Sequence, residues 1–153
     1  MPIILTYNIN GIRAAIKKDL PKWINSTSAD IICLQEIKAK EEQFDKEIFE
    51  EYGYSSYIKS AEKPGYSGVA IISKIKPQYI EYECGISKID SEGRFIRLDF
   101  GELSKSTICS LYFIPTAIFS IYTSGAFNSP PSSVIAITDN EFSPAVAQIV
   151  VPS

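Results

Sequence analysis

The sequence predicts an α/β fold in which helices lie over stacked sheets. Its first third alternates short apolar runs with amphipathic segments, and residues 54–113 contain five short apolar runs separated by turn residues. At 153 residues, 45% hydrophobic and 12% aromatic, the chain can bury the core of one globular domain. From residue 114 the composition changes and shows no clear period, so we expect an irregular C-terminal tail.

The N-terminal segment predicts a strand followed by two short helices. Residues 3–7 are an apolar run that ends at Asn8, as expected of a buried strand. Residues 11–16 carry apolar side chains at i, i+3 and i+4, which predicts one or two helical turns. Asp19 is a suitable N-cap for a second helical segment, on which Trp23 would face the core.

A second strand and a further helix are predicted next. Residues 31–34 are apolar throughout, which is typical of a strand covered on both faces. The stretch "AKEEQFDKEIFEEYG" at 39–53 sets Phe44, Ile48 and Phe49 as an apolar stripe among charged residues, which indicates an amphipathic helix that ends at Gly53.

The following segment predicts a mostly antiparallel series of strands. The turn signal "DSEG" at 90–93 separates two of the runs. The five runs are "YSSYIKS", "SGVAIISK", "PQYIEYE", "GRFIRLDF" and "STICSLYF".

The composition breaks at about residue 114. All 15 Lys and Arg residues lie at or before Lys105, and the only charges in residues 114–153 are Asp139 and Glu141. A domain of ordinary composition would carry several basic residues over such a length. We therefore divide the chain at this point into residues 1–113 and a divergent tail, residues 114–153, and hypothesise that the tail is translated out of frame.

Charge, cysteine content and hydropathy restrict the class of protein. The net charge of −3 gives no support to non-specific coating of nucleic acid, although a nuclease with its basic residues on one face stays compatible. Cys33, Cys84 and Cys109 lie in or near apolar runs, which favours buried thiols and a cytoplasmic location. No run approaches the roughly 20 apolar residues of a membrane span, and the first residues lack the pattern of a signal peptide.

Polar residues follow the first two predicted strands. Asn8 ends the first run, and Glu36 follows the second. If the two strands are parallel neighbours, both residues meet at the sheet edge where such folds bind ligands, and Gly11 lets the chain turn so that Asn10 comes near. A carboxylate beside amides suits a hard cation such as Mg²⁺. On spacing alone, the alternative that these residues are solvated strand ends stays open.

Four stretches carry a resemblance to a known family. They are "TYNINGIRAAIKK", "DIICLQEIKAKEEQF", "AEKPGYSGVAIISKIKP" and "DSEGRFIRLDFG". In this order they resemble the exonuclease III family of abasic-site endonucleases, within the larger endonuclease/exonuclease/phosphatase group. The resemblance covers residues 2–113, which would be the N-terminal half of a family member.

The resemblance implies a four-layer α/β sandwich, here incomplete, with two stacked mixed sheets and outer helices. It implies a DNA-repair nuclease that uses Mg²⁺ or Mn²⁺ to cleave the phosphodiester 5′ to an abasic site in double-stranded DNA, with 3′-to-5′ exodeoxyribonuclease activity in some members. It gives no oligomeric state.

The resemblance also implies roles for particular residues. Glu36 in "LQE" matches the metal-binding glutamate, and Asn8 in "YNING" matches the active-site asparagine, which we group with the metal site. Asn10 matches the next polar position, a supporting one. Tyr112 falls where the family has a catalytic tyrosine in a pattern like Y-F-P-x-G, but this chain reads "YFIPTA" and departs from that pattern.

Four further residues near these motifs need an interpretation. Arg13 and Lys38 follow the strand ends, where they could contact the DNA backbone, or equally could be surface cations. Tyr66 and Ser67 in "GYSGVAI" also resemble a family signature, but we interpret them as packing and turn-forming residues.

The remaining catalytic motifs of the family are missing. The chain has no G-D-x-N, no S-D-H and no histidine at all. We therefore expect a truncated form with little or no activity. Two alternatives stay open: a non-catalytic fragment that binds nucleic acid or a partner, and a phosphoesterase of the same superfamily with another substrate.

Overall fold

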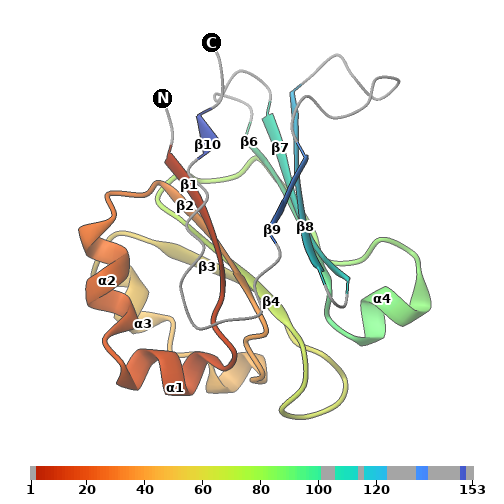
Figure 1. The fold of residues 1–153 in the computed structure, drawn as a ribbon, viewed down its shortest axis with the longest axis horizontal. Coiled ribbons are helices and arrows are strands. Elements are labelled where there is room, and N and C mark those ends of the chain that lie inside the picture. Colours follow the sequence, from red (N-terminus) through yellow and green to blue (C-terminus); the bar gives the residue numbers. More distant parts are fainter. Residues whose placement is uncertain (1–2, 101–105, 114–115, 124–133, 138–148, 151–153) are drawn as a thin grey trace.

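The computed structural model describes residues 3–100 with their side chains, and the backbone of residues 106–113, 116–123, 134–137 and 149–150. The described strands form two sheets stacked face to face, with helices over the outer face of the first (Figure 1). The α/β class and the stacked-sheet architecture that the sequence predicts are therefore confirmed. No helix among the described residues is both long and apolar enough to cross a membrane.

The first sheet positions the strand ends of interest. Its order is β10 (Ile149–Val150), β1 (Ile3–Asn8), β2 (Ile31–Gln35), β4 (Val69–Ser73), β3 (Ser55–Lys59). β1 and β2 pair in parallel, and the other pairs are antiparallel, so this sheet is mixed. The helical connection between β1 and β2 is what parallel neighbours require.

The second sheet is antiparallel along all of its described strands, and not mixed as the resemblance implied. Its order is β5 (Tyr79–Glu81), β6 (Phe95–Phe100), β7 (Ser106–Phe113), β8 (Thr116–Thr123), β9 (Val134–Ile137). Consecutive strands pair throughout, and each of these pairs is antiparallel. All five predicted strand runs form strands, but β3 and β4 belong to the first sheet and β5, β6 and β7 to the second.

The tail is not wholly irregular, because β8, β9 and β10 lie within residues 114–153. Their sequences, "TAIFSIYT", "VIAI" and "IV", are rich in β-branched and aromatic residues, which suit a pleated surface. The lack of charges in this segment predicted irregular structure, but these β-branched and aromatic runs form strands.

Two apolar cores enclose the first sheet. Successive residues of β2 point into opposite cores: Ile32 and Leu34 face the helices, while Ile31 and Cys33 face the second sheet. The outer core receives apolar side chains from α1 (Ile12–Lys17), α2 (Leu20–Ser26) and α3 (Glu47–Glu50), and the inner core receives Ile96, Leu98 and Phe100 of β6. Both faces of β2 are thus covered, as its continuous apolar sequence predicted.

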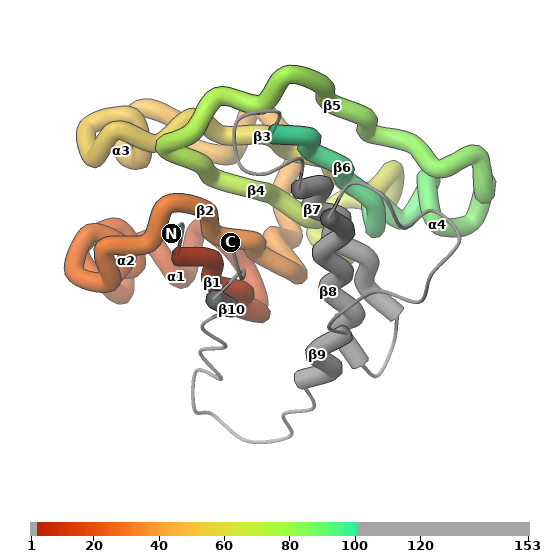
Figure 2. The backbone as a smooth tube through the Cα atoms, turned by 90° about the horizontal axis from the view of Figure 1, so that it is seen from above, coloured from red at the N-terminus to blue at the C-terminus, as the bar shows by residue number. Residues whose placement is uncertain are grey.

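The short helices differ in detail from the prediction. α1, α2 and α3 lie on one side of the molecule and α4 (Ser87–Ser91) on the opposite side (Figure 2). Asp19 is the N-cap of α2, but its backbone is left-handed and its side chain makes no capping bond, since it pairs with Lys22 at 2.9 Å. Trp23 is partly buried against the outer core and its ring lies 5.4 Å from that of Tyr7.

The helix predicted over residues 39–53 is interrupted. It is replaced by a 3-10 turn, η1 (Glu41–Gln43), and by α3, with extended backbone at Phe44. On one continuous helix, Phe44 and Phe49 would point about 140° apart, because five residues turn through roughly 500°. The break lets both rings enter the core, where their centroids lie 5.4 Å apart.

Tyr54 links the β3 end of the sheet to the loop before β2. Its hydroxyl donates a hydrogen bond to the backbone carbonyl of Ala29 at 2.6 Å, and the side chain is almost fully buried. Burial first, and then the nearby charge of Asp30, raises the pKa of Tyr54 to about 12. The folded chain therefore favours the neutral phenol.

Tyr54→Phe should destabilise the fold by about 1 to 2 kcal/mol, because the Ala29 carbonyl loses its buried donor. The stability that the raised pKa of Tyr54 provides is fully present below pH 10 and is lost as the pH rises toward 12, so the variant should lose less stability over that range. Urea unfolding below pH 10 and again near pH 12 measures both effects. Tyr79→Phe, at a side chain that is 50% exposed, is the matched control and should change little. Equal behaviour of the two variants would contradict the prediction.

The burial and bonding of the cysteines can be compared with the buried thiols that the sequence predicts. Cys33 is buried and Cys84 is partly buried, and within the described part of the chain neither is in a disulfide, as the prediction of buried thiols expects for Cys33. The side chain of Cys109 lies outside the described part of the chain.

Candidate active site

The parallel pairing of β1 and β2 brings the two predicted site residues together. Asn8 is the last residue of β1 and lies opposite Gln35, the last residue of β2, so Glu36 follows directly beside it. The amide Nδ2 of Asn8 donates a hydrogen bond to Oε1 of Glu36 at 3.2 Å. The juxtaposition predicted from the sequence is therefore present in the fold.

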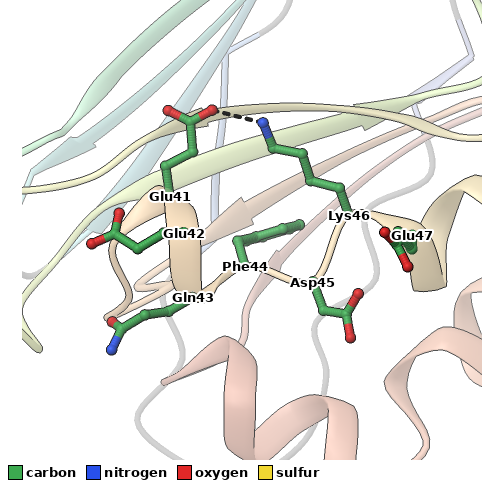
Figure 3. Close-up of a pocket in the computed structure, with 7 residues that line it drawn as sticks. All are labelled: Glu41, Glu42, Gln43, Phe44, Asp45, Lys46 and Glu47. Atoms are coloured by element: carbon green, nitrogen blue, oxygen red, sulfur yellow. Dashed lines mark hydrogen bonds and ion pairs between the residues drawn. The ribbon is translucent and has the colours of Figure 1, made fainter.

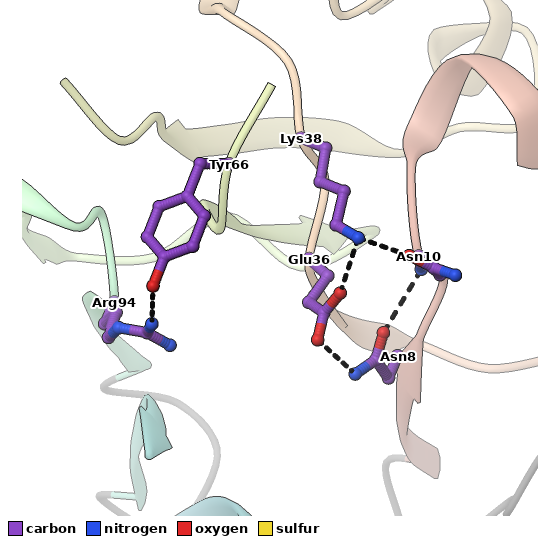
Figure 4. Close-up of polar contacts among 6 residues, drawn as sticks. All are labelled: Asn8, Asn10, Glu36, Lys38, Tyr66 and Arg94. Carbon is purple, nitrogen blue, oxygen red and sulfur yellow. Dashed lines mark hydrogen bonds and ion pairs between the residues drawn. The ribbon is translucent and has the colours of Figure 1, made fainter. Parts of the chain in front are cut away.

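Asn10 and Lys38 close a ring of polar contacts with this pair (Figure 4). The backbone N–H of Asn10 donates to Oδ1 of Asn8 at 3.1 Å. The ammonium of Lys38 lies 3.0 Å from Oε2 of Glu36 and also donates to Oδ1 of Asn10. Four residues from two strand ends thus form one connected group.

Three members of this ring have left-handed backbones. The φ angles are 46° at Asn10, 53° at Glu36 and 48° at Lys38, a region that non-glycine residues rarely adopt. Each such residue costs on the order of 1 kcal/mol or more, and clusters of them persist where surrounding structure holds them. Such a concentration of strain is typical of functional sites.

Backbone hydrogen bonds between loops hold this conformation. The N–H of Gly11 donates to the carbonyl of Glu36 at 2.8 Å, which ties the loop after β1 to the loop after β2. The N–H of Lys38 donates to the carbonyl of Ser67 at 2.9 Å, which ties the loop after β2 to the loop before β4. Ser67 is buried with a left-handed backbone, so its predicted role in turn formation agrees with the structure.

The other predicted site residues are Arg13 and Tyr112. Arg13 is exposed in the first turn of α1. Tyr112 belongs to β7 and lies opposite Ala117 of β8, but its side chain is outside the described residues. Their roles stay predictions.

Sequence reasoning missed a second polar cluster, which contains Tyr66 and Arg94 (Figure 4). The guanidinium of Arg94 donates to the hydroxyl of Tyr66 at 3.1 Å, and its side chain pairs with Glu92. Arg94 is only 5% exposed, and Lys63 places its ammonium 5.2 Å from the centroid of the Tyr66 ring. The sequence interpretation assigns Tyr66 to packing and turn formation, and Arg94 lies inside "DSEGRFIRLDF", which reads as a turn followed by a strand.

The ring offers oxygen donors that suit a hard cation. It contains one carboxylate, that of Glu36, and the side-chain amide oxygens of Asn8 and Asn10. Mg²⁺ binds proteins through only one or two carboxylates, and water and phosphate oxygens complete its shell. The described residues contain no group of three or more His, Cys, Asp or Glu side chains able to hold a metal. The donor set therefore fits a cation that keeps most of its shell for water and substrate.

A separate open hollow of about 860 Å³ lies between η1 and α3 (Figure 3). None of the ring residues lines it. Lys46 crosses it to pair with Glu41 at 2.6 Å. Its lining residues are Glu41, Glu42, Gln43, Phe44, Asp45, Lys46 and Glu47.

Comparison with known proteins places this geometry in a family. A model of the Endonuclease/Exonuclease/phosphatase family matches residues 5–145. The chain is 38% identical over 106 residues to an exodeoxyribonuclease of Bacillus subtilis (strain 168), which covers 69% of this chain and 41% of that protein. It is 37% identical over 99 residues to the DNA repair nuclease APEX1 of Danio rerio, which covers 63% and 32%.

Solved structures agree on the fold. An AP endonuclease from Archaeoglobus fulgidus superposes with a TM-score of 0.64 at 27% identity, over 73% of this chain and 41% of that one. The 3′-5′ exonuclease NExo from Neisseria meningitidis superposes with a TM-score of 0.62 at 22% identity, over 72% and 41%. The chain spans less than half the length of each of these four relatives. With the family model matching most of its residues, the chain belongs to the Endonuclease/Exonuclease/phosphatase family.

Proposed function

We propose that the chain supplies part of the active site, Glu36 and the residues around it, of a divalent-cation-dependent DNA-repair nuclease that cleaves phosphodiesters at abasic sites. By itself the chain would have little or no activity. The observation that carries this proposal is the contact between Asn8 and Glu36 at the carboxyl ends of two adjacent parallel strands. Relatives named as an exodeoxyribonuclease and as AP endonucleases support the choice of DNA as substrate.

The residues in this part of the active site have distinct roles in the proposal. Bound Mg²⁺ or Mn²⁺ would neutralise charge on the scissile phosphate and on its leaving oxygen. Glu36 would hold the cation, and Asn8 orients Glu36 through the 3.2 Å hydrogen bond to Oε1. Arg13 and Lys38 would contact backbone phosphates and so position the duplex.

Low activity of the isolated chain follows from the groups that it lacks. The sequence contains no histidine and neither of the two later motifs that the family resemblance calls for. The resemblance implies that an aspartate of the first motif activates water and that a histidine of the second stabilises charge on the phosphate. Without these two groups, Glu36 and its neighbours can bind and orient but supply only part of the chemistry.

A complementation assay tests the proposal. The full chain is mixed with the part of the Bacillus subtilis exodeoxyribonuclease that the match does not cover, and incision of an abasic duplex is followed with Mg²⁺ or with a chelator. We expect Mg²⁺-dependent incision from the mixture and almost none from either part alone. Failure of the mixture to incise, with both parts folded, would count against the proposal.

The two alternatives give different results in the same experiment. A non-catalytic binding fragment would retain affinity for the abasic duplex in a gel-shift assay without incision in any mixture. A phosphoesterase with another substrate would hydrolyse small phosphodiesters to a phosphomonoester and an alcohol without a preference for abasic DNA.

The origin of the tail, residues 114–153, can be tested separately. We propose that residues 114–153 are out-of-frame translation, because they contain no Lys or Arg. Resequencing the locus and translating the downstream nucleotides in all three frames would reveal G-D-x-N and S-D-H in another frame. Unrelated sequence in all frames would refute this origin. A cytoplasmic location stays a prediction, supported by the reduced thiols of Cys33 and Cys84.

A further inference from the structure

Lys38 occupies the position in the ring where a cation would be expected. Its ammonium contacts Oε2 of Glu36 at 3.0 Å and also donates to Oδ1 of Asn10. Oε1 of Glu36 already accepts from Asn8. The ammonium is therefore held by a carboxylate oxygen and an amide oxygen of the same set that would serve a divalent cation.

We propose that Lys38 is a resident counter-ion of Glu36 that competes with the divalent cation and leaves Glu36 when the cation binds. This inference rests on the proposed function, in which Glu36 holds that cation. Lys38 is a positioning residue here, because its effect on the cation acts through the charge of Glu36.

The charges of the ring explain why the two cations compete. The Lys38 ammonium balances the single negative charge of Glu36, and the two asparagines are neutral. A divalent cation at Glu36 would lie within a few ångströms of the ammonium, where like charges repel each other. One carboxylate cannot keep full contact with both cations.

The structure also allows Lys38 to move without disturbing the loop. The base of the residue is fixed, because its backbone N–H donates to the carbonyl of Ser67 at 2.9 Å. Its side chain is 35% exposed and has a flexible four-carbon stem. The ammonium can therefore swing into solvent while the left-handed backbone that shapes the ring stays in place. Once released, it is free to contact a phosphate of the duplex.

Mn²⁺ titration of the full chain, followed by electron paramagnetic resonance, tests the competition. Lys38→Gln should bind Mn²⁺ about fivefold more tightly than the wild type, the size of a partly exposed ion pair. Lys38→Arg keeps the charge and should bind no more tightly than the wild type. Lys76→Gln is the matched control, because it removes the same charge from an exposed residue. Lys76 follows Ser73, which pairs with Ile31 at the end of β2 that is remote from Glu36.

A second measurement separates competition from a change in folding. Mn²⁺ should raise the unfolding temperature of Lys38→Gln more than that of the wild type, because tighter binding stabilises the folded state further. Equal or weaker Mn²⁺ binding by Lys38→Gln would overturn the proposal, as would an absence of binding in both proteins throughout the millimolar range. Tighter binding by Lys38→Gln together with a failed complementation assay would uphold the competition and reject the DNA-repair function alone.

Discussion

Glu36→Gln should lower the rate of Mg²⁺-dependent incision in the complemented mixture by at least about a hundredfold. A bound metal contributes several kcal/mol of charge stabilisation in a phosphodiester transition state, and about 2.7 kcal/mol corresponds to a hundredfold in rate. Glutamine has the same shape and keeps an oxygen that can accept from Asn8, but it removes the only carboxylate of the ring. The loss would therefore come from charge and not from packing.

A matched control isolates that charge. Glu83 is 69% exposed at its side chain and pairs with Lys59 at 3.0 Å, so Glu83→Gln makes the same chemical change in a surface ion pair outside the ring. It should leave the incision rate within about twofold, because exposed ion pairs contribute little. If Glu36→Gln retained most of the activity while Glu83→Gln behaved as the wild type, Glu36 could not be the residue that holds the metal.

The strands and the meeting of their ends could be predicted because they depend on local pattern. The apolar runs that end at Asn8 and Gln35 give β1 and β2, and the helical connection between them is long enough for the parallel pair that the structure shows. Once the pair is parallel, Asn8 and Glu36 must share one edge. This part of the candidate site follows from sequence order and sheet geometry alone.

Other features depend on contacts that are distant in sequence and leave no local signal. Arg94 reaches Tyr66 across 28 positions, and neither residue departs from an ordinary turn or strand pattern. The left-handed backbone of Glu36 could not be predicted from the sequence either, because glutamate has no preference for this conformation. Backbone hydrogen bonds to other loops maintain it. The helix predicted from the periodicity is broken at Phe44, because only then can the rings of both Phe44 and Phe49 be buried in the core.

The loops around the candidate site form one connected unit. Lys40 donates from its ammonium to the carbonyls of Ala61 at 2.7 Å and Glu62 at 2.8 Å, which joins the loop after β2 to the loop after β3. The N–H of Glu62 donates to the carbonyl of Ser91 at 2.8 Å, which joins that loop in turn to the end of α4. The turn before β6 therefore has to approach the backbone at Ala61 closely, and Gly93 is the residue at that approach.

Gly93→Ala should destabilise the fold by about 3 kcal/mol, within the range of overpacking substitutions. A Cβ atom at residue 93 would lie 2.5 Å from the carbonyl carbon of Ser60 and 2.6 Å from the backbone nitrogen of Ala61. Both atoms belong to backbone, so no side chain can rotate away to make room. For a chain of this length, the unfolding temperature should fall by about 6 to 12 °C.

Gly53→Ala separates the steric effect from the backbone effect. Gly53 also has a positive φ, 81° against 59° at Gly93, but a Cβ atom there would meet nothing within 4 Å. It should therefore cost only about 1 kcal/mol, the penalty of a left-handed alanine. Urea unfolding of both variants gives the difference, which measures how tightly the turn before Arg94 is pressed against the loop after β3. Equal losses in the two variants would mean that the turn can move away, and that the position of Arg94 beside Tyr66 is not fixed by this contact.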